Sequence, residues 1–136
     1  MDRGYNYTAI GCFGMTEIGH GTNVAGLETT ATYDAATREW FVNSPTATAA
    51  KRWAGALGRT ATLCAVFLQL IVGETNHGIH VLVVQIRDGE THETLPGCII
   101  GSLGEKAGVN MVDNGFLHFD NYRVPYDALL DRYSQV

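Results

Sequence analysis

The apolar run ATLCAVFLQLIVG at 61–73 decides the fold class of this chain more than any other stretch. It is too short to cross a bilayer, which takes about 20 apolar residues as a helix, and it contains Gln69. Its Thr, Val, Phe and Ile residues and the Gly73 that follows favour a strand over a buried helix. A strand of this kind needs several partners, so the rest of the chain must supply a sheet.

Further strand patterns follow one another without a helix-length pattern between them. Residues 27–34 and 40–44 read as a hairpin across a short polar loop, and 73–78 reads as a turn-rich loop. The other expected strands are 79–87, 98–104 and 115–125, the last with a bend at Asp120–Asn121 and an end at Pro125, and from Tyr126 the pattern turns helical. We therefore predict a mainly β fold, an antiparallel barrel or sandwich of about six to eight strands with a short C-terminal helix stub.

Length and composition fit one globular domain. The chain has 136 residues and a formal net charge of −5, and its nine Lys and Arg residues are scattered, which argues against nucleic-acid binding. Cys12, Cys64 and Cys98 are an odd number without zinc-ligand spacing, so we expect reduced, mostly buried thiols. We expect a single domain over 1–136, with a β-barrel at 11–125 and the start of a truncated helical region at 126–136.

The glycine-rich stretch GCFGMTEIGHGTNVAGLETTATYD at 11–34 is the first candidate site. Its loop could expose backbone N–H groups to an anion or a ring carbonyl, with hydroxyls from Thr16 and Thr22, or it could be only a β-bulge or turn. Glu17 and His20 resemble an acid–base pair, but their side chains need not converge. We expect Glu17 to be salt-bridged or capping, and we give His20 no catalytic role.

The stretch KRWAGALGRT at 51–60 is the second candidate site. Trp53 beside the bare backbone of Gly55 could pack on a planar ring, or it could be a core tryptophan next to a tight turn. Lys51 and Arg52 could meet a phosphate, but we favour a solvated rim. The histidines show no metal-ligand spacing, so no metal site is predicted; these are His77, His80, His92 and His118.

Three stretches in order, 11–34, 43–62 and 95–130, resemble the acyl-CoA oxidases, the oxygen-using branch of the acyl-CoA dehydrogenase superfamily. The resemblance covers 11–134 and implies the middle β-barrel of an FAD enzyme, between helical parts that this chain lacks. The implied reaction belongs to fatty acid β-oxidation: α,β-dehydrogenation of a fatty acyl-CoA, with FAD reoxidised by O₂ to give H₂O₂. It also implies a homodimer in the complete protein and a fragment that is inactive alone.

The resemblance assigns roles to a few residues. Thr16 and the Met15 backbone would contact the flavin, Trp53 would flank its ring, Gly55 would leave space for O₂, and Thr22 would touch the CoA arm. The two segments would then form opposite margins of a slot for the ring. The family's catalytic glutamate lies in the C-terminal helices, so no catalytic residue is expected here.

Two positions depart from the family pattern, and three readings of the function remain. Arg52 stands where many members carry a second aromatic residue, and Ala54 where many have proline.

One alternative to the oxidase is an acyl-CoA dehydrogenase that passes electrons to an electron-transfer flavoprotein; another is a non-enzymatic β-barrel interaction module. The compartment would be a bacterial cytoplasm, which the composition favours, or a peroxisome in a eukaryote.

Overall fold

The computed structural model describes residues 9–133 of the chain. That part contains nine strands and three short 3-10 turns. In chain order they are β1 (Gly11–Gly14), η1 (Val24–Gly26), β2 (Thr30–Asp34), β3 (Glu39–Asn43), η2 (Ala47–Ala49), β4 (Lys51–Gly55), β5 (Leu63–Val72), β6 (Thr75–Gln85), β7 (Cys98–Ser102), β8 (Asn114–Phe119), β9 (Tyr122–Pro125) and η3 (Tyr126–Ala128).

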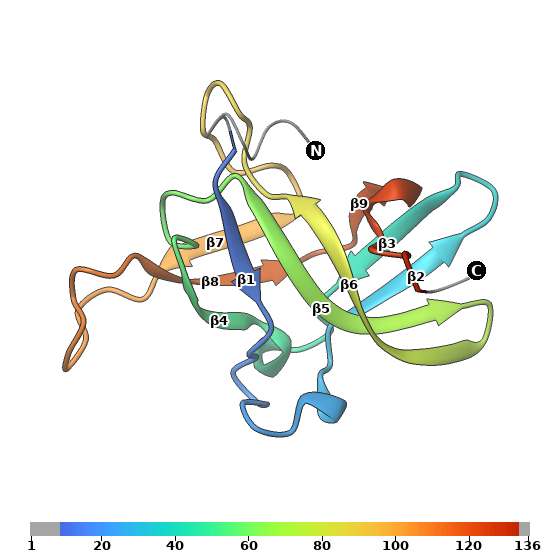
Figure 1. Cartoon of the computed structure of the whole chain (residues 1–136), viewed down its shortest axis with the longest axis horizontal. Coiled ribbons are helices and arrows are strands. Elements are labelled where there is room, and N and C mark those ends of the chain that lie inside the picture. The colour runs from blue at the N-terminus through green and yellow to red at the C-terminus, as the bar shows by residue number, and fades with distance from the viewer. Residues whose placement is uncertain (1–8, 134–136) are drawn as a thin grey trace.

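The long strand β5 organises the larger of two sheets (Figure 1). One edge of β5 pairs with β6 in an antiparallel hairpin. Its other edge is shared, because the first half pairs with β1 and the second half with β2, both in parallel. β2, β3 and β9 then continue the sheet in antiparallel register. The long apolar run thus became the central strand of a six-stranded sheet.

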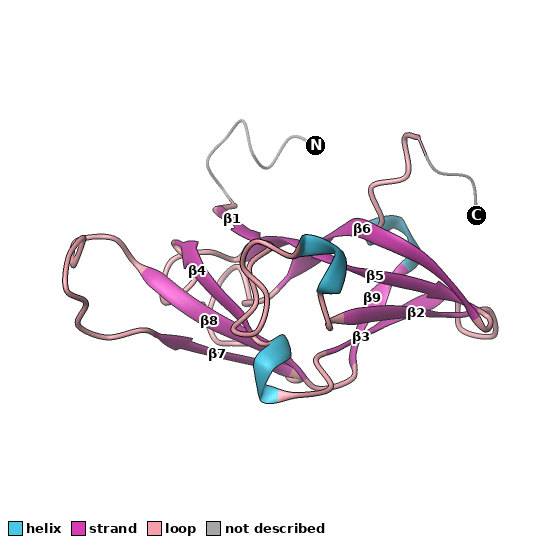
Figure 2. Ribbon diagram, turned by 90° about the horizontal axis from the view of Figure 1, so that it is seen from below, coloured by secondary structure: helices cyan, strands magenta, loops and turns pink. Residues whose placement is uncertain are grey.

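The smaller sheet has the order β4-β8-β7, and Figure 2 shows its strands gathered on one side of the molecule. Hydrogen bonds also join the two sheets. Glu17, just after β1, forms an isolated bridge with Lys51 of β4, and the Ser44 N–H donates to the Phe119 carbonyl at 2.9 Å. The core fills the space between the two curved sheets.

Alternating burial along the strands builds that core. On β5 the side chains of Cys64, Val66, Leu68 and Leu70 are buried while their neighbours are only partly covered. Period-2 alternation of this kind is expected where one face of a strand meets a core. The fully buried side chains with the largest volume include Trp40, Lys51, Phe119, Leu57, Leu68 and Leu70. Lys51 is the unexpected member of that set.

The predicted fold class is confirmed, with corrections in detail. The hairpin at 27–44 and the strand at 61–72 are present as β2–β3 and β5. Two short strands, β1 and β4, were not predicted, and the strand expected at 115–125 is divided into β8 and β9, so the described part has nine strands where six to eight were expected. The expected loop at 73–78 is wrong, because β6 already begins at Thr75 after a tight turn in which Gly73 has φ 60°.

The C-terminal helix stub is the single turn η3. Its N-terminal residue Tyr126 accepts from the Leu129 N–H at 3.4 Å. The helical spacing expected beyond it is absent from the described residues, because Leu129 bridges Leu82 and the Leu130 N–H donates to the Val81 carbonyl. Residues 134–136 of the expected helical region lie outside the described part. Within residues 9–133, no helix has the length and apolar character needed to span a membrane.

Candidate functional site

Trp53 stands at a strained position on the surface. The register between β4 and β8 shifts between Arg52 and Gly55, a β-bulge, and Trp53 there has φ 71°. A left-handed backbone is rare for a bulky residue and persists only where the surroundings impose it. Here the Asn114 amide donates to the Trp53 carbonyl at 2.7 Å, and the indole stays 51% exposed. The core-tryptophan interpretation is therefore wrong, since Trp40 fills that role.

The segment after β1 runs directly beside β4. The Arg52 N–H donates to the Thr16 carbonyl at 2.8 Å, and the Ile18 N–H donates to the Ala50 carbonyl at 3.0 Å. Thr16 itself is half-buried, and its own N–H makes no backbone hydrogen bond to the described residues. The structure thus brings the two segments together as neighbours along one edge, not as two separated walls, because Thr16 is hydrogen-bonded to Arg52, the residue before Trp53.

Gly55 completes this edge at the end of β4. It is exposed, and a Cβ added there would meet only the Val112 Cγ1 atom, at 4.0 Å. The backbone at Gly55 is therefore open to a ligand. Arg52 is half-buried, with its guanidinium 5.1 Å from the centroid of the Trp53 ring, which is cation–π geometry. Arg52 therefore covers one face of the indole, and Ala54 is buried.

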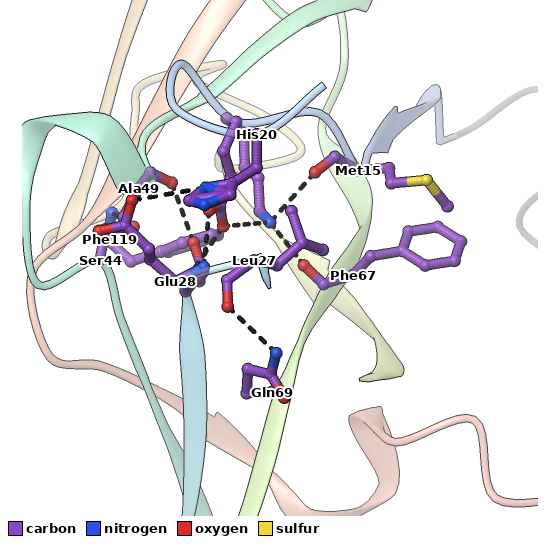
Figure 3. Close-up of polar contacts among 12 residues, drawn as sticks. Met15, His20, Leu27, Glu28, Ser44, Ala49, Phe67, Gln69 and Phe119 are labelled. Carbon is purple, nitrogen blue, oxygen red and sulfur yellow. Dashed lines mark hydrogen bonds and ion pairs between the residues drawn. The ribbon is translucent and has the colours of Figure 1, made fainter. Parts of the chain in front are cut away.

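A buried ion pair lies behind this edge, and it corrects the prediction that Lys51 is a solvated rim residue. The Lys51 Nζ atom lies 2.8 Å from the Glu17 carboxylate, and both side chains have 0% exposure. The same ammonium donates to the carbonyls of Met15 and Phe67. Figure 3 shows these two carbonyl oxygens converging on one buried amine. The prediction that Glu17 is salt-bridged is confirmed.

Opposing effects set the protonation of this pair. Burial raises the pKa of the Glu17 carboxyl, but hydrogen bonds from the Glu28 N–H, Lys51 and the Thr29 N–H outweigh it, so that pKa lies below its ordinary value. Burial lowers the pKa of Lys51, and Glu17 only partly restores it. Because the carboxyl group titrates in the acid range, Glu17 is ionised at neutral pH and needs the ammonium as a partner.

Glu17, His20 and Glu28 converge, although the sequence did not require it. Their ligand atoms lie within 4.8 Å of one another, and His20 Nδ1 is 3.6 Å from Glu28. Three of the roughly four lone-pair positions of the Glu17 carboxylate are already used, however. Its Oε1 accepts from Thr29 and Lys51, and its Oε2 accepts from the Glu28 N–H at 2.7 Å. The cluster is therefore a hydrogen-bonded support for the glycine-rich loop.

Arg87 is a second buried cation, and the sequence analysis missed it. Its guanidinium donates to the carbonyls of Ala61 at 2.7 Å and of Leu57 and Gly58 at 3.0 Å each. These carbonyls belong to the turn that follows β4. Asp113 holds the same turn from outside by accepting from the Arg59 and Thr60 N–H groups. The only signal in the sequence was that Arg87 ends the apolar strand pattern at 79–87.

Thr22 lies in the exposed loop before η1, where its carbonyl accepts from the Val24 N–H at 3.0 Å. No hydrogen bond among the described residues ties Thr22 to β4. A hollow of about 630 Å³ lies under the β7–β8 loop, and its lining includes Arg59, Lys106 and Val112, the last of which neighbours Gly55. Since that lining includes none of the predicted site residues, the candidate site is the open edge formed by Met15, Thr16, Trp53 and Gly55.

Known proteins resemble this chain in sequence and in fold. Residues 12–122 match the family described as "Acyl-CoA dehydrogenase, middle domain". The peroxisomal acyl-coenzyme A oxidase 1 of Rattus norvegicus is 49% identical over 127 residues, which are 93% of this chain and 19% of that protein. The peroxisomal acyl-coenzyme A oxidase 2 of Oryctolagus cuniculus is 47% identical over 133 residues, 98% of this chain and 20% of that protein.

Solved structures agree. Acyl-CoA oxidase-1 of Caenorhabditis elegans, complexed with FAD and ATP, has 44% identity and a TM-score of 0.96, over 99% of this chain and 21% of that chain. An acyl-CoA oxidase from Lycopersicon esculentum (tomato) has 45% identity and a TM-score of 0.97, over the same shares. The chain therefore spans about a fifth of the length of these relatives.

Proposed function

Since this chain belongs to the acyl-CoA dehydrogenase middle-domain family, we propose that it is the flavin-facing middle domain of an acyl-CoA oxidase. The observation that carries the proposal is 44–49% identity to acyl-CoA oxidases along nearly the whole chain. The activity belongs to a complete polypeptide about five times longer, because the chain spans only a fifth of those relatives. The chain alone is inactive.

The open edge has the features that a flavin requires. Trp53 offers an exposed, rigid aromatic face, and Gly55 has no side chain to obstruct a ring or O₂ beside it. Thr16 offers a half-buried hydroxyl and an N–H that makes no backbone hydrogen bond to the described residues. One aromatic face beside a few polar donors is the usual composition of a cofactor site. We assign FAD contacts to Met15, Thr16, Trp53 and Gly55.

The chemistry that FAD supplies is acceptance of a hydride from the β-carbon of a fatty acyl-CoA, followed by reoxidation by O₂ to give H₂O₂. The hydroxyl and N–H of Thr16, with the Met15 backbone beside them, would stabilise negative charge at the edge of the ring, as an oxyanion hole does. Thr22, on the exposed loop, contacts the CoA arm. The glutamate that removes the α-proton comes from helices outside this chain, so Glu17 has no catalytic part.

The remaining assignments follow from the relatives. Their names place them in peroxisomes, so we propose a peroxisomal location; the bacterial cytoplasm that the composition favoured has no support among them. The complete protein is a homodimer. The alternative acceptor is an electron-transfer flavoprotein, as in an acyl-CoA dehydrogenase, and the alternative class is a β-barrel interaction module without chemistry.

The test compares the complete polypeptide with this chain. We expect the complete polypeptide to retain FAD through desalting and to release H₂O₂ from fatty acyl-CoA in air, while the chain alone retains little FAD. Thr16→Val and Trp53→Ala should each weaken FAD retention, whereas the control Thr75→Val, at the exposed start of β6, should not. Electron transfer only to a flavoprotein acceptor would favour the dehydrogenase. If the complete polypeptide neither retains flavin nor turns over acyl-CoA, the result would favour the interaction module.

A further inference from the structure

Cys12 and Cys64 face each other across the β1–β5 pair. They are register partners in the parallel ladder, and both point to the inner face of the sheet, where Cys64 has 0% exposure. Neighbouring strands lie about 4.8 Å apart. A disulfide needs Cα atoms about 4.4–6.8 Å apart, so this register lies within reach of one. Both cysteines are free thiols in the structure.

Gly14 makes room for the buried thiol. A Cβ at Gly14 would sit 2.7 Å from the Cys64 Sγ atom, closer than side chains pack. The sulfur therefore occupies space that an alanine at position 14 would take. Gly14 follows Cys12 by two residues on the same face of β1, so both residues turn toward Cys64.

The two thiols differ in reactivity. A hydrogen bond from Cys64 lowers the pKa of the Cys12 thiol, against the effect of burial, and the Arg87 charge lowers it further. The same hydrogen bond and burial raise the pKa of Cys64. Cys12 is also half-exposed on the edge strand β1. Thiolate character and access together decide which cysteine meets an oxidant first.

We propose that Cys12 and Cys64 are a peroxide-sensitive dithiol that closes into a disulfide between β1 and β5. The Cys12 thiolate attacks one oxygen of H₂O₂, the O–O bond breaks, and the leaving hydroxide takes a proton to form water. Cys12 is then a sulfenic acid. The Cys64 sulfur attacks the Cys12 sulfur, and the second hydroxide leaves as water with the Cys64 proton. Two thiols are thereby oxidised and one peroxide is reduced to two waters.

The bond would fasten the edge strand that leads to the candidate site. β1 has four residues and is followed directly by Met15 and Thr16, so the cross-link ties the start of that segment to the central strand. The dithiol chemistry is independent of the proposed function. Only the local source of peroxide rests on it, because an acyl-CoA oxidase releases H₂O₂ from the flavin site.

The test adds H₂O₂ to this chain directly, so it does not depend on flavin or acyl-CoA. Native protein is treated with H₂O₂, quenched with a maleimide in denaturant, digested without reductant and mapped by mass spectrometry. Matched variants are Cys12→Ala, Cys64→Ala and Cys98→Ala. Cys98 is the internal control, because it lies on β7 opposite Phe119 and burial raises its pKa to about 12. A sample oxidised in urea measures pairing in the unfolded chain.

We expect the Cys12–Cys64 peptide to exceed the other two pairings by roughly tenfold or more in native protein, and the three to become comparable in urea. Cys98→Ala should keep the disulfide. Cys64→Ala should accumulate sulfenic and then sulfinic acid at Cys12, because the resolving thiol is gone. Comparable pairings in the native sample, or sulfinic acid at Cys12 with Cys64 still reduced, would overturn the proposal. So would modification of Cys64 in the Cys12→Ala variant at the native rate.

Discussion

Replacing Lys51 by methionine should destabilise this chain more than any surface substitution. Methionine keeps most of the side-chain volume but removes the ammonium, which donates to the Glu17 carboxylate at 2.8 Å and to the carbonyls of Met15 and Phe67. Each lost neutral acceptor costs about 1 kcal/mol. Glu17 is left as a buried charge with only backbone N–H donors, and breaking a buried pair in this way costs about 3–5 kcal/mol in all.

The loss should depend on pH in a defined direction. In Lys51→Met the ammonium no longer lowers the pKa of Glu17, so burial raises that pKa toward or above its unfolded value of 4.5. A protonated Glu17 no longer carries an unpaired charge. The free-energy difference between the two proteins should therefore be largest near pH 7 and should shrink as the pH falls toward the acid range.

Urea unfolding followed by tryptophan fluorescence measures these differences, since Trp40 is fully buried. The double variant Glu17→Gln/Lys51→Met should cost less than the sum of the two single variants by about 1–3 kcal/mol, because it leaves no unpaired charge. The matched control is Arg123→Met, which removes an exposed partner of Glu39 and should cost at most about 1 kcal/mol. The reasoning would be refuted if the free-energy changes of the two single variants simply add up in the double variant. It would also be refuted if Lys51→Met lowers the free energy of unfolding no more than Arg123→Met does.

Three further outcomes can be measured on the same chain. The pKa of Glu17 is lower in the folded than in the unfolded protein, so its contribution to the free energy of unfolding is full above pH 4.5 and is lost as the pH falls through the folded pKa. Over that pH range, the urea midpoint of Glu17→Gln should therefore fall less than that of the unsubstituted protein. Arg87→Met, which strips the donor from three carbonyls of the turn after β4, should cost about 2–4 kcal/mol and speed amide exchange there. Gly14→Ala should cost about 1–3 kcal/mol through its contact with the Cys64 sulfur, and adding Cys64→Ala should recover most of it; no recovery would contradict that contact.

The strands that could be predicted were those that alternate or are long. β5 combines an apolar run with a glycine stop, and β2–β3 combines β-formers with a polar loop, so both follow from local pattern. β1 and β4 could not be found in this way. Each is short, and β4, with the sequence KRWAG, shows no alternation of apolar and polar residues. Their strand conformation is imposed by tertiary pairing, which a local window does not contain.

The same distinction between local pattern and tertiary pairing applies to the candidate site. A threonine in a glycine-rich loop and a tryptophan next to a glycine mark two stretches of sequence, but nothing local indicates that the Arg52 N–H bonds the Thr16 carbonyl. The left-handed backbone of Trp53 is equally hidden, because it depends on a bulge that only the register with β8 creates. Sequence reasoning therefore pointed to these two stretches as candidates but predicted separated margins, whereas the structure places the two segments side by side.

The two buried cations explain how a strained, exposed edge can stay fixed. Trp53 lies between two backbone segments: the one after β1, held by Lys51 through Met15 and Glu17, and the turn after β4, held by Arg87. An ammonium or guanidinium loses its hydrating water on burial. Hydrogen bonds to several carbonyls compensate for that loss only if those carbonyls keep their places. Backbone displacement at either end of the edge would therefore leave a charge unsatisfied. Rigidity at the proposed flavin edge thus comes from charges behind it, and removing either cation should disturb flavin retention in the complete polypeptide although neither residue is among the proposed flavin contacts.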